Sequence, residues 1–330
     1  MTTSKHAPEL QQIVDAIASR RRFVLSSHSR PDGDAIGSQL AMAYALRALG
    51  KEVTVVNADP APAPLTAFPG VADITIAKTV EGDFDAAIIM ECGDLARTGV
   101  SGLDRFFVIN IDHHPGNSNY GAINWFDAGA AACAEMVFDL VRALGVALTP
   151  EIATHVYVGI LTDTGSFHYS SISPRTFDIC REALEAGVDP GQVARNVYDS
   201  NHIGRLKLFA AVLGTMRIDP TGRIATLYLD HAMTETSGGT YEDTDGLINE
   251  PLTVKEIVAV VFFKQHEGDT YRVSMRSKGQ IDIGAVAKEY GGGGHKNAAG
   301  CTVTGPVDAL RETFVGKIER AIDGRPARHR

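Results

Sequence analysis

Cysteine is scarce in this chain of 330 residues, and its four cysteines stand far apart, as Cys92, Cys133, Cys180 and Cys301. No Cys-x-x-Cys pair occurs, which argues against a disulfide framework and against a zinc site built from thiolates. We expect all four side chains to be buried as small apolar groups.

Long apolar runs are also missing. No stretch approaches the roughly 18 apolar residues of a membrane-spanning helix. The first residues, MTTSKHAPELQQ, lack the apolar segment and the small-residue cleavage site of a signal peptide. These absences predict a cytoplasmic protein without a membrane partner.

An excess of positive charge is absent as well. The chain has 31 Lys and Arg against 40 Asp and Glu, which gives a formal charge of −9. Residues 1–190 hold 13 basic and 23 acidic residues, whereas residues 191–330 hold 18 and 17. Such a chain is poorly suited to following long nucleic acid, because that binding depends on the release of counterions by basic residues. A short phosphate-bearing substrate is still compatible if bound cations mask part of the acidity.

Helical and strand-like segments alternate along the first half. Helical spacing is present over residues 8–20, 35–50, 134–145, 150–163 and 174–187, and nearly continuous apolar runs occupy 23–28, 53–58, 86–91 and 106–111. Such short runs are typical of strands buried on both faces of a parallel sheet. The order predicts an α/β fold, with a doubly wound, mostly parallel sheet over residues 1–190.

The second half of the chain shows a different order of predicted helices and strands. Residues 191–215 are predicted to form one connecting helix. Strand-like segments follow at 223–230, 256–265 and 270–277, then a short helix, a glycine loop and a strand within 281–305, and an amphipathic helix at 308–322. This pattern predicts a smaller α+β domain over residues 216–330.

Carboxylates and imidazoles follow the ends of the apolar runs in the first half. They are His28, Asp32 and Asp34 after the first run, Asp94 after the third, Asp112, His113 and His114 after the fourth, and Asp163 at the end of helix 150–163. In an open α/β sheet the carboxyl ends of the strands converge on one crevice, so we expect these side chains to meet. Oxygen and nitrogen ligands without sulfur suit Mn²⁺, Mg²⁺ or a similar ion. Two divalent cations would offset the four carboxylates Asp32, Asp34, Asp94 and Asp163.

A structural role is the alternative for each acid taken singly. An Asp at a strand end is more often a helix cap or a turn residue, and Asp34, just before a predicted helix, fits that role too. The repeated occurrence of His and Asp at the same end of several elements favours a metal site.

Four consecutive glycines, Gly291–Gly294, precede His295. Glycine N–H groups can approach an anion closely and form a phosphate-binding nest. The run does not match the GxGxxG pattern of dinucleotide-binding folds. A flexible loop or the end of a helix is the alternative. His295 and the pair Arg276-Ser277 favour phosphate binding, since Arg can hold a phosphate through two hydrogen bonds.

These residues together resemble a known family. His28-x-x-x-Asp32-x-Asp34, Asp94, Asp112-His113-His114 and Asp163 resemble the four motifs of the DHH phosphoesterase superfamily, and the glycine run with His295 and Ala298-Ala299-Gly300 resembles the signature of the DHHA1 domain. The resemblance covers nearly the whole chain and is greatest to the nanoRNase type, the bifunctional oligoribonucleases and pAp phosphatases. Two positions depart from the pattern: His168, where many relatives have Arg, and Cys133, where Ser or Thr is commoner.

The resemblance implies a role for each residue. Two cations, most often Mn²⁺ with Mg²⁺ or Co²⁺ as alternatives, would be held by His28, Asp32 and Asp94 on one side and by Asp34, Asp94, His113 and Asp163 on the other, so that Asp94 is shared. Asp112 would orient a histidine, and His114 would bind the scissile phosphate or act as the general acid. Substrate would also be bound by Arg97, Arg276, Ser277, Gly292, Gly293, Gly294 and His295.

The activity implied by the resemblance is metal-dependent hydrolysis of short RNA or DNA oligonucleotides to mononucleotides, and of pAp to AMP. Three alternatives remain: a single-strand exonuclease, an inorganic pyrophosphatase and a non-catalytic nucleotide-binding regulator. A single Trp and an acidic first half argue against the exonuclease, which needs stacking aromatics and a basic groove. The glycine run with His295 argues against the pyrophosphatase.

Overall fold

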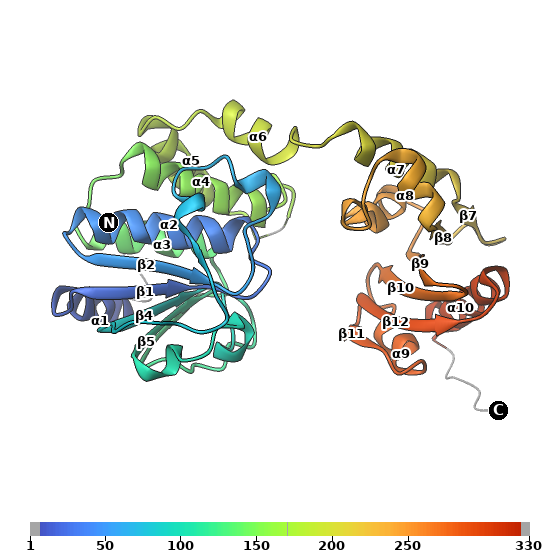
Figure 1. Cartoon of the computed structure of the whole chain (residues 1–330), viewed down its shortest axis with the longest axis horizontal. Helices are drawn as coiled ribbons and strands as arrows, with labels where there is room; N and C mark the ends of the chain where they lie inside the picture. The colour runs from blue at the N-terminus through green and yellow to red at the C-terminus, as the bar shows by residue number, and fades with distance from the viewer. Residues whose placement is uncertain (1–6, 170, 325–330) are drawn as a thin grey trace. The chain divides into compact units, whose positions relative to one another are not determined.

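A computed structural model describes residues 7–169 and 171–324 of the chain. The chain divides into two compact units, and the division falls between Ser200 and Asn201 (Figure 1). Each unit is built around its own six-stranded sheet.

The sheet of the first unit is parallel throughout. Its strands are β1 (Arg22–Ser26), β2 (Glu52–Asn57), β3 (Thr75–Ile76), β4 (Ala86–Met90), β5 (Phe107–Asp112) and β6 (Ile123–Phe126), in the spatial order β3-β2-β1-β4-β5-β6. Every residue of β4 is buried, as expected for a central strand covered on both faces. The strand order changes direction between β1 and β4, so a binding crevice is expected at the carboxyl ends of these two strands.

Helices cover one face of this sheet. They are α1 (Ala7–Ala18), α2 (Gly33–Ala48), α3 (Cys133–Ala143) and α4 (Pro150–Asp163), with α5 (Pro174–Glu185) and α6 (Pro190–Tyr198) following them in the chain. On the other face, residues such as Val24 and Ile89 pack against Val80, from the segment between β3 and β4, and against Val100 and Leu103, from the segment between β4 and β5. The prediction of an α/β fold with a parallel sheet is confirmed.

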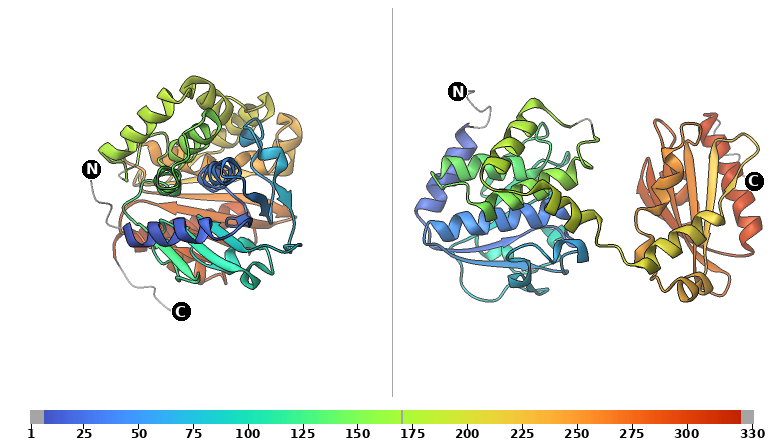
Figure 2. Two further views of the ribbon diagram at one scale, coloured as in Figure 1. Left: turned by 90° about the vertical axis from the view of Figure 1, so that its left-hand side faces the viewer. Right: turned by 90° about the horizontal axis from the view of Figure 1, so that it is seen from above.

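The second unit has a mixed sheet. Its strands are β7 (Arg217–Ile218), β8 (Ile224–Leu229), β9 (Ala259–Glu267), β10 (Thr270–Ser277), β11 (Gly293–His295) and β12 (Ala298–Thr304), in the order β11-β12-β10-β9-β8-β7, and only the β8–β9 pairing is parallel among the described residues. Helices α7 (Ile203–Gly214) and α8 (His231–Ser237) lie on one side, and α9 (Ile283–Lys288) and α10 (Val307–Ile322) lie on the other (Figure 2). Residues of β9 alternate between the two cores, since Phe262 packs with α7 and Phe263 packs with α10.

Short 3-10 helices complete the structure at Ala63–Leu65, Val71–Asp73, Leu95–Thr98 (η3), Leu103–Arg105, Glu242–Thr244 and Leu247–Thr253. The four cysteines are free and buried, which confirms the prediction for them. Among the described helices, none has both the length and the apolar character needed to cross a bilayer.

One predicted element is wrong. Residues 191–215 form two helices, α6 and α7, instead of a single connecting helix. Between them lies the polar stretch Asp199-Ser200-Asn201-His202, in which Asp199 ends α6 and His202 precedes the first residue of α7. Asp, Ser and Asn favour turns because their side chains compete for backbone hydrogen bonds.

Candidate metal centre and substrate-binding residues

Four side chains from different elements meet at the carboxyl edge of the first sheet. The potential ligand atoms of Asp34, Glu91, His113 and Asp163 all lie within 4.8 Å of one another. His113 is central: its Nε2 is 3.3 Å from Glu91 Oε1, 3.4 Å from Asp163 Oδ2 and 4.0 Å from Asp34 Oδ2. We call these four residues the metal cluster, because their oxygen and nitrogen atoms are ligands that Mn²⁺ and Mg²⁺ accept.

Asp34 is the most buried member. Its carboxylate accepts the N–H groups of Cys133 at 2.6 Å and Ala134 at 3.0 Å, where α3 begins, and the hydroxyl of Ser38 at 3.0 Å. The N-terminus of a helix favours such an anion. Burial and the nearby acids Glu91 and Asp163 nevertheless raise the pKa of Asp34 well above its usual value. A bound cation would relieve this cost.

These contacts explain one departure from the family pattern. Cys133 contributes its backbone N–H to Asp34, while its Sγ lies 3.5 Å from the carbonyl of Ile111. The contact to Asp34 therefore does not depend on the Cys133 side chain, and a cysteine at this position leaves it intact.

Glu91 is the member that the sequence reasoning missed. It follows β4, it is buried, and its φ of +56° lies in the left-handed region that few non-glycine residues adopt. Its Oε1 contacts both His113 and His114 Nδ1, the latter at 3.1 Å. Its Oε2 is buried without a hydrogen-bond partner, an arrangement that is costly unless another group binds there.

Asp94 lies outside the metal cluster. Its exposed carboxylate accepts the N–H of Ala96 at 2.8 Å and caps η3. The structure thus gives Asp94 the helix-cap role that was the alternative for acids at strand ends. Glu91, three residues earlier, occupies the place among the histidines that was predicted for Asp94, because the chain turns away from the cluster after Glu91.

His28 and Asp32 form a pair beside the metal cluster. His28 Nε2 is 3.7 Å from Asp32 Oδ2, and His28 Nδ1 lies 2.9 Å from the carbonyl of Ser29. Asp32 also caps α2 through the N–H of Ala35 at 3.0 Å. The contact with Asp32 raises the pKa of His28, and Glu91 adds to this rise, which shows that the pair is within electrostatic range of the cluster.

The two histidines after β5 are oriented by different groups. His113 Nδ1 lies 3.1 Å from the carbonyl of Ala130, so its Nε2 faces the carboxylates. Burial opposes a charge on this ring, but the contacts with Glu91, Asp34 and the carbonyl of Ala130 together outweigh burial and raise the pKa of His113 to about 10. Asp112 lies 3.1 Å from His114 Nδ1 and also accepts the amide of Asn117 at 2.7 Å.

The turn after Glu91 is held by the segment between β5 and β6 and by β5 itself. The hydroxyl of Tyr120 donates to the carbonyl of Cys92 at 2.8 Å, and Asn110 Nδ2 donates to the same carbonyl at 3.2 Å. The N–H of Ser118 donates to the carbonyl of Gly93 at 2.9 Å. A left-handed non-glycine residue costs on the order of 1–3 kcal/mol, so these bonds help to keep Glu91 in place.

Close packing of helices brings the remaining acid to the cluster. A Cβ atom on Gly159 of α4 would lie 2.6 Å from Ala134 Cβ and 2.7 Å from Asp34 Oδ1. Glycine here lets α4 approach α2 and α3 closely enough for Asp163, at the end of α4, to reach His113. Burial raises the pKa of Asp163 to about 6.

The predicted substrate residues are spread over both units. Arg97 is exposed in η3, and its carbonyl accepts the N–H of Ser29 at 2.8 Å, which ties the loops after β1 and β4 together. Arg276 is half-buried on β10. Ser277 is buried on the opposite face of that strand; its hydroxyl donates to the carbonyl of Ile281 at 2.8 Å and accepts from Asn297 at 2.9 Å. Ser277 therefore stabilises the turn after β10.

The local structure by itself explains why glycine stands at two positions of the run. The N–H of Gly292 donates to the carbonyl of Ala287 at the end of α9, and a Cβ at Gly292 would lie 2.2 Å from the carbonyl oxygen of Gly300. Gly294 has a φ of +136°. These contacts match the helix-end alternative for the first part of the run, and substrate binding by Gly292, Gly293, Gly294 and the exposed His295 remains a prediction.

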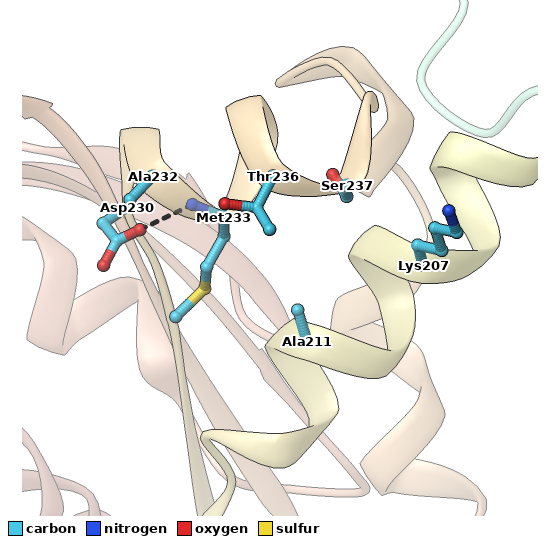
Figure 3. Close-up of a pocket in the computed structure, with 7 residues that line it drawn as sticks. All are labelled: Lys207, Ala211, Asp230, Ala232, Met233, Thr236 and Ser237. Atoms are coloured by element: carbon cyan, nitrogen blue, oxygen red, sulfur yellow. Dashed lines mark hydrogen bonds between the residues drawn. The ribbon is translucent and has the colours of Figure 1, made fainter.

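A separate pocket lies within the second unit, between α7 and α8 (Figure 3). It has a volume of about 380 Å³ and is lined by Lys207, Ala211, Asp230, Ala232, Met233, Thr236 and Ser237. The carboxylate of Asp230 accepts the N–H of Met233 at 2.8 Å and so caps α8. The pocket contains none of the residues predicted to bind metal or phosphate.

Comparison with known proteins identifies the class. Residues 22–160 match the N-terminal domain of the DHH family, and residues 223–323 match the DHHA1 domain. The chain belongs to the DHH family of phosphoesterases that carry a DHHA1 domain, which confirms the resemblance.

Within this family the chain is similar to proteins named bifunctional oligoribonuclease and PAP phosphatase NrnA. It is 36% identical over 282 residues to the Thermus thermophilus protein of that name, covering 85% of this chain and 84% of the relative. Identity to the Bacillus subtilis protein is 27% over 300 residues, covering 88% and 92%.

Solved structures agree on the fold. An exopolyphosphatase-related protein from Bacteroides fragilis superposes with a TM-score of 0.87 at 26% identity, covering 97% of this chain and 98% of that chain. RecJ from Thermus thermophilus in complex with Mn²⁺ has a TM-score of 0.53 at 15% identity, covering 98% and 56%, and shows similarity of fold alone.

Proposed function

We propose that this protein is a phosphoesterase that depends on divalent cations and hydrolyses short oligonucleotides to mononucleotides and pAp to AMP. The observation that carries the proposal is the metal cluster of Asp34, Glu91, His113 and Asp163 at the switch point of the sheet. The similarity to NrnA proteins over most of the chain supports the choice of substrates. Within this proposal a cytoplasmic location stays a prediction.

The side chains present fit two divalent cations. Asp34, Glu91, His113 and Asp163 would hold one, and His28, Asp32 and Glu91 the other, with Glu91 shared in place of Asp94. The unpartnered Oε2 of Glu91 and the raised pKa values of Asp34 and Asp163 support this assignment, because each records a carboxylate that lacks its counter-charge. Mn²⁺ is the preferred ion, with Mg²⁺ or Co²⁺ as alternatives. When bound, the cations supply Lewis-acid polarisation of the phosphoryl group and activation of water.

His114 is placed to handle a proton or a phosphate oxygen. Its Nδ1 lies against Asp112 and Glu91, which leaves Nε2 as the atom to face the substrate. The contact with Asp112 raises the pKa of His114, which favours the protonated ring, and in that form Nε2 would donate a proton to the leaving oxygen. We assign Arg97 and Arg276, the exposed and half-buried guanidinium groups, to the phosphates of the substrate.

One panel of substrates tests the proposal. The purified protein is assayed with added Mn²⁺ against pAp, a 5′-phosphorylated dinucleotide, a longer oligonucleotide and pyrophosphate, with Asp163→Asn as the matched control. We expect AMP from pAp and mononucleotides from the dinucleotide, both lost in the variant. Cleavage of pyrophosphate alone would favour the pyrophosphatase, and preference for the longer oligomer would favour the exonuclease. Nucleotide binding without hydrolysis would favour the regulator.

A further inference from the structure

The turn that follows Asp163 has an unusual backbone. Gly165, Ser166 and Phe167 are three consecutive residues in the left-handed region, with φ of +56°, +60° and +64°. Two of them carry side chains, and each such residue costs on the order of 1–3 kcal/mol. Strain of this kind persists only where the surrounding structure imposes it, and it concentrates at functional sites.

Several contacts hold the turn in this conformation. The N–H of Ser166 donates to the carbonyl of Leu161 at 2.9 Å, and the N–H groups of His168 and Tyr169 both donate to the carbonyl of Thr164, at 2.9 and 3.1 Å. The ring of Phe167 stacks on Phe177 with centroids 5.4 Å apart. Phe167 is thus the inward anchor of the turn.

The residues after the anchor point outward. His168 is exposed, and Tyr169 is 58% exposed although it is a large aromatic residue. Their ring centroids are 6.1 Å apart. The Tyr169 ring is held over Gly165, where a Cβ atom would lie only 2.6 Å from Cζ of the tyrosine. The ring therefore lies against the backbone two residues from Asp163, a member of the metal cluster.

Further aromatic residues gather at the same turn. Phe177 is 54% exposed and stacks on Phe167, while Tyr198 is 42% exposed and accepts the hydroxyl of Ser166 at 2.7 Å. Three exposed aromatic side chains thus contact the turn that directly follows the cluster residue Asp163. Large parts of these rings remain exposed beyond these contacts, and exposed aromatic rings are surfaces on which nucleobases stack.

We propose that Tyr169, with His168 beside it, forms a stacking platform for the base of the nucleotide next to the scissile phosphate. This inference rests on the proposed function and deepens it, because it names the nucleobase as a recognised part of the substrate. The two rings of a purine offer more stacking surface than one pyrimidine ring, so the platform favours a purine at this position.

The test compares matched substrates and matched variants. KM and kcat are measured with Mn²⁺ for a 5′-phosphorylated adenine dinucleotide and for two analogues that each lack one base. We expect Tyr169→Ala to raise KM for the dinucleotide by about 10-fold with little change in kcat, as loss of one stacked base implies. Tyr169→Phe keeps the ring and retains the wild-type KM. One of the two analogues is cleaved equally well by wild type and Tyr169→Ala.

Calorimetry of Mn²⁺ binding distinguishes a stacking role of Tyr169 from a role in holding Asp163 in place. The proposal requires unchanged Mn²⁺ affinity in Tyr169→Ala. An equal loss on all three substrates, a weaker Mn²⁺ affinity or an unchanged KM for the dinucleotide would each overturn it. If the wild-type protein cleaves none of the three substrates, the proposed function itself fails and the platform fails with it.

Discussion

At the scale of single residues, the backbone directs the side chains of Glu91 and Asp94 to different places. Glu91 leaves β4 with a left-handed φ and turns its carboxylate toward His113, whereas Asp94 caps η3 in solvent. We therefore expect Glu91→Gln to lower kcat/KM for a dinucleotide by more than about 100-fold and to weaken Mn²⁺ binding, since under the proposal Glu91 would bind both cations.

Asp94→Asn is the matched control for this change. Asn also caps helices, and surface substitutions of this type change free energies by roughly 0.5 kcal/mol or less, so kcat/KM should stay within about 2-fold of wild type. Steady-state kinetics and Mn²⁺ calorimetry on both variants check the prediction. Loss of activity in Asp94→Asn with a fully active Glu91→Gln would restore Asp94 as the shared ligand.

Tyr120 is a positioning residue for Glu91. Its hydroxyl donates to the carbonyl of Cys92, directly after Glu91, and also accepts the amide of Asn110 at 2.8 Å. Removal of such a supporting bond typically weakens metal affinity by about 10-fold or more. We expect this loss in Tyr120→Phe, measured as the Mn²⁺ dissociation constant. Tyr44→Phe, in a part-buried tyrosine of α2, serves as the control, and an equal effect in both variants would argue against a positioning role.

At the scale of single residues, much of the site could be predicted from the sequence. Asp34, His113 and Asp163 were predicted to converge because they lie at the boundaries of recognisable elements, and their potential ligand atoms do lie within 4.8 Å of one another, with the pair His28–Asp32 beside them. Glu91 was missed because it stands at the end of an apolar run, and Asp94, three residues later, is the more obvious ligand by its position after that run. Whether Glu91 or Asp94 faces the metal cluster depends on the φ angle of Glu91, and that angle cannot be predicted from the pattern of residue types.

At the scale of elements, the approach of α4 to α2 and α3 depends on Gly159. In Gly159→Ala the new methyl group would collide with Ala134 and with the carboxylate of Asp34. Overpacking of this kind costs about 1–3 kcal/mol. We expect a lower thermal midpoint and, because Asp34 moves, a weaker affinity for Mn²⁺.

Gly214→Ala provides the control for this substitution. A Cβ atom at Gly214, the last residue of α7, would meet nothing within 4 Å. Since Ala favours a helix over Gly by about 1 kcal/mol, this variant should be neutral or more stable. A Gly159→Ala protein with wild-type stability and Mn²⁺ affinity would show that the helices need no such close contact.

Helix α4 also contains a buried histidine that couples stability to pH. Burial lowers the pKa of His155 to about 4, and its Nε2 lies 2.8 Å from the carbonyl of Pro69. In the unfolded chain the pKa is near 6.5. The unfolded state therefore binds a proton first as the pH falls, so stability that is complete above pH 6.5 is lost toward pH 4.

Between about pH 7 and about pH 5 we expect this loss to be on the order of 2 kcal/mol in the free energy of unfolding. Urea denaturation at about pH 7 and about pH 5 measures it, because the midpoint reports stability. His155→Gln keeps an N–H donor for Pro69 but does not titrate, so its stability should fall less with pH. Identical pH dependence in both proteins would contradict the assignment.

Most elements could be predicted from periodicity, and the exceptions have physical reasons. The run at 86–91 became β4 because continuous apolar residues suit a strand buried on both faces, and the run at 53–58 became β2, whose last three residues are buried. Strand β3 is two exposed residues long and leaves no apolar pattern to detect. The polar residues 199–202 interrupt the predicted connecting helix. The prediction missed this break because the segment as a whole passes from charged to apolar residues, as a single helix can.

At the scale of the whole molecule, charge is divided between the halves of the chain. Residues 1–190, with their excess of acidic residues, contain the whole metal cluster, and residues 191–330 have nearly balanced charge. This division fits the proposal that the first unit binds the cations. Cations held in the first unit would reduce the acidity that otherwise repels a nucleotide.

The central claim is that side chains following β1, β4 and β5, together with side chains of α2 and α4, bind divalent cations at one edge of the first sheet. X-ray diffraction from crystals soaked in Mn²⁺, collected at the manganese absorption edge, tests it most directly. The account predicts two anomalous peaks, one at bonding distance from Asp34, Glu91, His113 and Asp163 and the other from His28, Asp32 and Glu91. Ordered side chains with no peak among them, or a peak bound by Asp94 and not by Glu91, would contradict it.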